Sequence, residues 1–157
     1  MVFKHALSIK GFTLLEVIVS IFILGILATI MVVQLNNEDP VAELDRNARA
    51  TVNVLQLARS YAMSGYQNID SYGVYMYSNR QYLIYADSNG NQRRDTGEEI
   101  INYYLDENIS FDGIRDICFS QIGSAEASNT AIILQSTDTE TEITITIEES
   151  TGGIFYE

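Results

Sequence analysis

Five oxygen-bearing side chains between residues 87 and 98 have a spacing that suits a metal ion. If Asp87 is position 1, then Asn89, Asn91, Asp95 and Glu98 stand at positions 3, 5, 9 and 12. Calcium takes about six to eight oxygen ligands, and a loop of about 12 residues supplies them from these same positions. The spacing therefore makes calcium a candidate ligand of this segment.

The same segment departs from the calcium pattern in three ways. Gln92 stands at position 6, where the pattern requires glycine, and Arg93 and Arg94 add positive charge. Strands rather than helices are expected on both sides. An Asn/Gly-rich hairpin turn, held by hydrogen bonds from its own Asx side chains, explains the same residues without a metal. Calcium site and hairpin turn are both compatible with the sequence.

A long apolar segment near the N-terminus contains one charged side chain. Residues 12–33 have Glu16 as their only charge, and a helix rising about 1.5 Å per residue over this length covers roughly 33 Å, enough for a bilayer core of about 30 Å. Lys4 and Lys10 precede the segment, which places this flank in the cytoplasm and the rest of the chain outside. A carboxylate inside such a helix costs about 2.5–3.5 kcal/mol, so Glu16 needs a partner.

The residues from Lys10 to Val17, with sequence KGFTLLEV, resemble the class III signal of type IV pilins and type II secretion pseudopilins. The resemblance implies that prepilin peptidase cleaves between Gly11 and Phe12 and that the new N-terminus is N-methylated. It also implies that the ammonium group of Phe12 pairs with Glu16 of an adjacent subunit in a filament. The implied location is the inner membrane, single-pass, with the C-terminal domain in the periplasm. A plain signal anchor, in which Glu16 only reaches the membrane interface, is the alternative.

The rest of the chain is acidic and poor in catalytic side chains. From Glu38 onward it has 20 acidic and 7 basic residues, a net charge of −13, which disfavours nucleic acid as a partner. Removal of the leader would remove His5, the only histidine, and Cys118 is the only cysteine, so no disulfide, zinc site or His-dependent catalytic site is expected. We therefore expect no enzyme activity. Cys118 is expected to be a small core residue on a strand, and the ten tyrosines are expected to pack within the strands.

Periodicity predicts a helix followed by strands. Pro40 is expected to kink or interrupt the helix. After it, residues spaced alternately by four and three form one face of a helix: Leu44, Ala48, Thr51, Leu55, Ala58 and Ala62. Gly65 is expected to end this helix. Beyond Gly65 we expect strands over residues 72–77, 81–85, 99–105, 117–122, 131–135, 142–148 and 154–156. The predicted fold class is α+β, with a long N-terminal transmembrane and amphipathic helix packed on an antiparallel β-sheet or small β-sandwich.

The expected organisation has four parts. They are a prepilin leader (1–11), a transmembrane and polymerisation helix (12–33), an amphipathic helix extension (34–65) and a periplasmic β-domain (66–157).

Two further segments, Leu57–Gly65 and Tyr85–Glu98, resemble the GspH/FimT group of minor pilin-like proteins. The resemblance implies a minor pseudopilin, a structural subunit of the pseudopilus of a type II secretion system. Its partners would be other pseudopilins or pilins, prepilin peptidase and the inner membrane. One alternative is a FimT/FimU-type minor pilin of a type IV pilus. The other is a membrane-anchored calcium- or glycan-binding module.

Overall fold

The computed structural model describes residues 12–35, 39–127 and 131–157. The chain divides into two compact units, residues 1–38 and residues 39–157. The expected leader, including Gly11, lies outside the described residues, as does Glu38.

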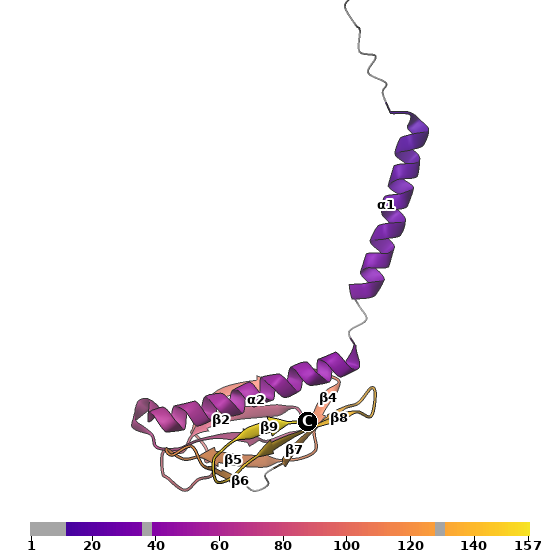
Figure 1. Ribbon diagram of the computed structural model, residues 1–157. Coiled ribbons are helices and arrows are strands. Elements are labelled where there is room, and N and C mark those ends of the chain that lie inside the picture. Colours follow the sequence, from indigo (N-terminus) through magenta and orange to yellow (C-terminus); the bar gives the residue numbers. More distant parts are fainter. Residues whose placement is uncertain (1–11, 36–38, 128–130) are drawn as a thin grey trace, which may run out of the picture. The chain divides into compact units, whose positions relative to one another are not determined.

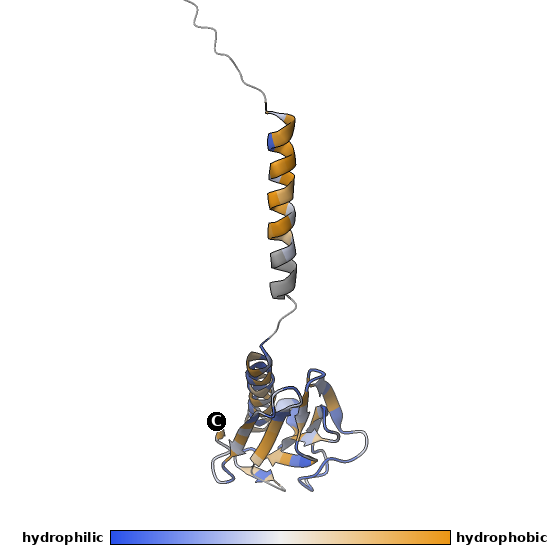
Figure 2. Cartoon of the chain, turned by 90° about the vertical axis from the view of Figure 1, so that its right-hand side faces the viewer, coloured by the Kyte–Doolittle hydropathy of each residue, from blue (hydrophilic) through white to orange (hydrophobic). Residues whose placement is uncertain are grey.

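Helix α1 (Leu14–Leu35) is the regular element of the first unit. The hydroxyl of Thr13 accepts a hydrogen bond from the backbone N–H of Glu16 at 3.3 Å and so caps the start of the helix. Apolar side chains are exposed on every side of α1 from Leu14 to Leu27, and Figure 2 colours most residues of this stretch as hydrophobic. In the part of the chain that the structure describes, no helix is both long and apolar enough to cross a membrane. The membrane span expected over residues 12–33 stays a prediction.

Helix α2 (Pro40–Ser64) begins and ends at recognisable helix signals. The carboxylate of Asp39 accepts a hydrogen bond from the N–H of Val41 at 3.0 Å, and Pro40 occupies the first turn, where its missing N–H costs nothing. Gly65 takes a left-handed conformation (φ 60°) at the C-terminal cap, as expected for the residue that stops a helix. Pro40 therefore stands at the start of a helix and not inside one.

The predicted stripe of α2 is confirmed as its buried face. Its six side chains are each at most 1% exposed: Leu44, Ala48, Thr51, Leu55, Ala58 and Ala62. The buried hydroxyl of Thr51 donates to the carbonyl of Asn47 at 2.9 Å, so no polar group of the stripe is left unsatisfied. Because three of the six are alanines, the helix backbone can approach the sheets closely.

Nine strands in the described residues form two sheets, and α2 contacts strands of both (Figure 1). One sheet has the order β3-β2-β1-β5-β6 and the other the order β4-β7-β8-β9, with every pair antiparallel. The strands are β1 (Tyr72–Met76), β2 (Gln81–Ala86), β3 (Glu99–Tyr104), β4 (Ile109–Phe111), β5 (Arg115–Phe119), β6 (Ala125–Ala127), β7 (Ala131–Ser136), β8 (Glu142–Ile147) and β9 (Ile154–Tyr156). The predicted α+β fold with antiparallel pairing is confirmed.

The strand predictions differ from the structure mainly around β5. This strand begins at Arg115 and ends at Phe119, whereas the prediction extended it to Ile122. The chain turns at once after Phe119, because the N–H of Ser120 pairs with the carbonyl of Ser124 and Gly123 takes a φ of 84°. Ile122 is therefore an exposed turn residue. Strands β4 and β6 and the short 3₁₀ helix Tyr66–Asn68 were not predicted.

Polar contacts fix both ends of α2 to the strands. Near its start, Asn47 donates to a carboxylate oxygen of Asp106 at 2.9 Å and accepts from the backbone N–H of Asp106 at 3.2 Å. Near its end, Arg59 donates to the carbonyls of Gly123 at 3.1 Å and Thr151 at 2.9 Å, and so holds the β5–β6 and β8–β9 turns. These contacts orient the helix along its whole length.

The outer face of the five-stranded sheet contains a glycine that is needed for packing. Gly73 on β1 is paired with Tyr85 on β2, and the ring of Tyr85 lies directly over it. The hydroxyl of Tyr85 reaches a carboxylate oxygen of Asp116 on β5 at 2.7 Å, and burial raises the pKa of this phenol. A Cβ atom on Gly73 would lie 2.3 Å from the ring, which no relaxed structure allows.

We predict that Gly73→Ala destabilises the domain by about 1–3 kcal/mol, the usual cost of overpacking, because the ring of Tyr85 must leave its place and its bond to Asp116. Thermal unfolding followed by circular dichroism measures this. Gly113→Ala is the matched control, since a Cβ there meets only the flexible end of Arg115 at 3.0 Å. Equal melting temperatures for the two variants would contradict the packing described here.

Candidate functional site

Glu16 lies in the first turn of α1, among exposed apolar side chains. Phe12, which precedes the helix, is 83% exposed. The hydroxyls of Ser20 and Thr29 each donate to a helix carbonyl four residues earlier, at 2.7 Å, so they are satisfied within α1. Among the described residues, Glu16 has no ion-pair partner. Its carboxylate lies near the N-terminal, positive end of the helix dipole.

All five predicted calcium ligands take part in hydrogen bonds within the loop between β2 and β3. Asp87, only 3% exposed, accepts from the backbone N–H of Asn91 at 3.1 Å, the N–H of Gln92 at 2.8 Å and the hydroxyl of Ser71 at 3.0 Å. Asp87 therefore acts as the internal anchor of the loop. An ion at this carboxylate would have to replace these three donors.

The other four side chains form two smaller groups. Asn89 and Asn91 both donate to one carboxylate oxygen of Asp95, each at 2.7 Å, and these hydrogen bonds lower the pKa of Asp95. Glu98 accepts from the N–H of Ser88 at 3.0 Å and from the N–H of Asp95 at 2.9 Å. In the described part of the chain, no group of three or more His, Cys, Asp or Glu side chains is placed to hold a metal. The hydrogen bonds are those of the hairpin-turn interpretation, and calcium binding stays a prediction.

One departure from the calcium pattern has a structural counterpart. Gln92 stands where the pattern has glycine, and its φ of 61° is the left-handed conformation that glycine adopts most easily. The backbone thus adopts the left-handed conformation that the pattern requires at this position, although glutamine adopts it less easily than glycine. Gly90 and Gly97 supply two more positive φ values, 70° and 96°, in the same loop.

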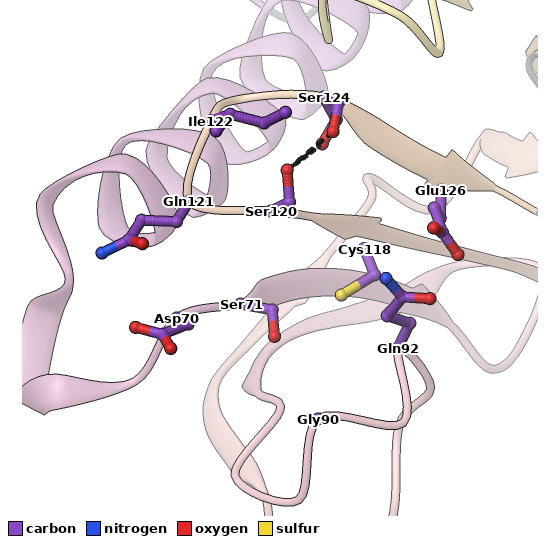
Figure 3. A pocket seen from close by; sticks show the side chains of 10 residues that line it. All are labelled: Asp70, Ser71, Gly90, Gln92, Cys118, Ser120, Gln121, Ile122, Ser124 and Glu126. Carbon is purple, nitrogen blue, oxygen red and sulfur yellow. Dashed lines mark hydrogen bonds between the residues drawn. The ribbon is translucent and has the colours of Figure 1, made fainter.

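A hollow of about 360 Å³ adjoins this loop and was not anticipated from the sequence. Figure 3 shows it between the loop, represented by Gly90 and Gln92, and the turn that follows β5. The hydroxyls of Ser120 and Ser124 lie 2.6 Å apart at its edge. Its lining comes from three separate segments of the chain, so no local spacing in the sequence could have indicated it.

Cys118, which also lines this hollow, is 2% exposed and lies in β5, which confirms the expectation of a small buried strand residue. Burial raises the pKa of its thiol to about 12, so the thiolate needed for nucleophilic chemistry is scarce at neutral pH. The sequence places no histidine among the described residues that could serve as its base.

Comparisons with known proteins concern the N-terminal segment and the fold. Residues 8–32 match the prokaryotic N-terminal methylation motif. No curated protein matches the sequence. The chain is thus similar to type IV pilins in two respects: a methylation motif in its N-terminal segment and a fold in which a helix packs on antiparallel β-sheets.

Among solved structures, the fold is similar to the crystal structure of the type IV minor pilin FimU of Pseudomonas aeruginosa (strain PAO1). The TM-score is 0.55 and the sequence identity 16%, over 74% of this chain and 89% of that one. At this identity the likeness concerns the fold.

The loop network yields a test that separates the two interpretations of residues 87–98. Asp87→Ala leaves the N–H of Gln92 and the Ser71 hydroxyl without their acceptor, and each such loss costs about 1–3 kcal/mol. We predict a clearly lower melting temperature for this variant with or without metal. Ser88→Ala, which removes an exposed hydroxyl that donates to Glu98 at 2.8 Å, should change it little.

Calcium and magnesium titrations of the wild type complete the test. A calcium site raises the melting temperature at millimolar calcium more than at equal magnesium, because binding to the folded state alone stabilises it. It also requires that Asp87→Ala abolish the difference. Equal shifts of the melting temperature with both ions would reject the calcium hypothesis. General screening of the charges of an acidic protein would then explain the effect.

Proposed function

We propose that the chain is a minor pilin of a type IV pilus, a structural subunit that assembles with other pilins through α1. The observation that carries the proposal is the likeness to FimU, which extends over 89% of that minor pilin. This likeness favours the pilus over the type II secretion pseudopilus, which the sequence resemblance implied. The methylation motif over residues 8–32 supports the filament class in general.

Processing follows from the same motif. Prepilin peptidase would cut between Gly11 and Phe12, remove the basic leader and create an ammonium group on Phe12. The segment 12–33 would anchor the chain in the inner membrane before assembly, with residues 39–157 in the periplasm. The support for this anchor is the run of 22 residues with a single charge.

Filament assembly would cover the exposed apolar faces of α1 with other protein. A helix that is apolar all round is stable only when lipid or protein covers it, and lipid can do this before assembly. In the filament, helices of neighbouring subunits would replace lipid. Glu16 would then meet the Phe12 ammonium of an adjacent subunit in a water-poor interior, where an unpaired carboxylate is costly. The pair thus fixes the axial position of one subunit against the next.

We predict that Glu16→Ala inserts into the membrane but is lost from the filament. Insertion no longer buries a charge, whereas assembly loses the partner of the Phe12 ammonium, and breaking a buried ion pair costs about 3–5 kcal/mol. Crosslinking to sister pilins in cells should therefore fall by more than about tenfold. Glu16→Gln, which keeps the shape and removes the charge, should behave in the same way.

The control is Glu142→Ala, which removes an exposed carboxylate at the start of β8 and should leave crosslinking unchanged. Full crosslinking of Glu16→Ala at wild-type membrane levels would show that this carboxylate only reaches the membrane interface. The proposed assembly contact would then be wrong.

A further inference from the structure

A groove of about 540 Å³ lies on the outer face of the five-stranded sheet, away from the core side chains. Its centre is one row of residues across three strands, because Tyr75 on β1 is paired with Leu83 on β2 and Leu83 with Asn102 on β3. Alternate residues of a strand face the same side, so Tyr77 lies on the same face as Tyr75. The volume falls within the range of about 300–1,000 Å³ that is typical of small-molecule sites.

Tyr75 and Tyr77 form the aromatic wall of this groove. The rings of Tyr75 and Tyr77 are nearly parallel, with 17° between their planes and 6.4 Å between their centroids, near the wide end of the range for paired rings. Both residues are half-buried, whereas Tyr72, Tyr82 and Tyr85 are buried and serve the packing expected of strand tyrosines. Leu83, 3% exposed, closes the floor of the groove.

The charged groups in the groove cancel each other. Arg94 forms an ion pair with Glu99 and lies over the ring of Tyr75, with its guanidinium carbon 5.6 Å from the ring centroid. The other carboxylate oxygen of Glu99 accepts from the N–H of Gly97 at 3.0 Å. The groove is thus electrically neutral, while the chain from Glu38 onward carries a net charge of −13. The negative field would repel an anionic ligand, since Arg94 is already paired, and a cationic ligand would find the carboxylate of Glu99 already paired with Arg94.

A neutral ligand with both apolar and polar faces fits this lining. The tyrosine rings offer flat apolar surfaces, and the exposed amide of Asn102 offers one acceptor and two donors next to them. A purely apolar ligand would leave that amide unpaired, at a cost comparable to a lost hydrogen bond. A sugar ring has C–H groups on its faces and hydroxyls around its edge, so it satisfies rings and amide together.

We propose that this groove, formed by Tyr75, Tyr77, Leu83, Arg94, Glu99 and Asn102, binds a neutral oligosaccharide. A sugar ring packs on the tyrosines while Asn102 and the Arg94–Glu99 pair bind its hydroxyls. The site is made entirely by residues of one folded unit. In a surface-exposed subunit it would give the filament affinity for uncharged glycans.

The test uses the full chain, kept in solution with a zwitterionic detergent that contains no sugar. It is applied to a printed array of neutral and acidic oligosaccharides, and the strongest neutral binder is then titrated by isothermal calorimetry. We expect saturable binding of neutral oligosaccharides. Tyr77→Ala should weaken the titrated sugar by about tenfold, a loss in the range of one aromatic contact. Asn102→Ala should weaken it as well.

Two variants separate the groove from general effects. Tyr77→Phe keeps the ring and should retain most of the affinity, while Phe155→Ala removes an aromatic side chain that is 61% exposed on β9 and should not change it. Circular dichroism and melting curves establish that each variant is folded. Absence of binding to every neutral oligosaccharide, selective binding of acidic ones, or full affinity in folded Tyr77→Ala would each overturn the proposal.

Discussion

Burial of one face of α2 against strands of both sheets is the contact on which the folded unit of residues 39–157 depends. Leu44 and Leu55 each gain about 1.5–3 kcal/mol from full burial, and the alanines between them let the helix backbone lie close to the strands. Core residues of both sheets gather around this face in one cluster. The polar contacts of Asn47 and Arg59 then fix the direction of the helix, because they join its two ends to loops remote in the sequence.

This arrangement also determines which surfaces remain for function. Since α2 and the core occupy the inner face of the five-stranded sheet, its outer face carries the packed side chains described above, next to the loop between β2 and β3. The close approach of Tyr85 to Gly73 packs the middle of this face. On either side of it lie the hollow lined by Cys118 and the groove lined by Tyr75 and Asn102. The proposed assembly through α1 and the proposed ligand binding at the outer face thus use different units of the chain.

Much of the fold could be predicted from the sequence because its signals are local. The stripe of α2, the cap residue Gly65 and the alternation of Ile143, Ile145 and Ile147 in β8 all depend on spacings of four residues or fewer. Strands β4 and β6 were missed because three residues show no clear alternation, whereas β9, which is equally short, follows the Gly152-Gly153 turn signal. The end of β5 was misplaced because Ile122 is apolar, although a glycine turn follows it directly.

The candidate sites also differ in whether their residues are close in the sequence. Glu16 stands out in the sequence, since a single carboxylate in an apolar run is costly, and the residues of the 87–98 loop are close neighbours. Their hydrogen bonds could not be predicted, because Asp87 is held partly by Ser71, which precedes β1 in the sequence, whereas Asp87 follows β2. The groove escaped prediction for a related reason: Tyr75, Leu83 and Asn102 meet only through strand register.

The central claim, that this chain becomes a filament subunit through its N-terminal helix, has one direct test. Pili sheared from cells that express the chain are purified, and the intact mass of the chain recovered in them is determined. The account predicts that the chain is present as a minor component and that it begins at Phe12, with one added methyl group. Recovery of the chain only in membranes, or a mass that retains Met1 to Gly11, would contradict it.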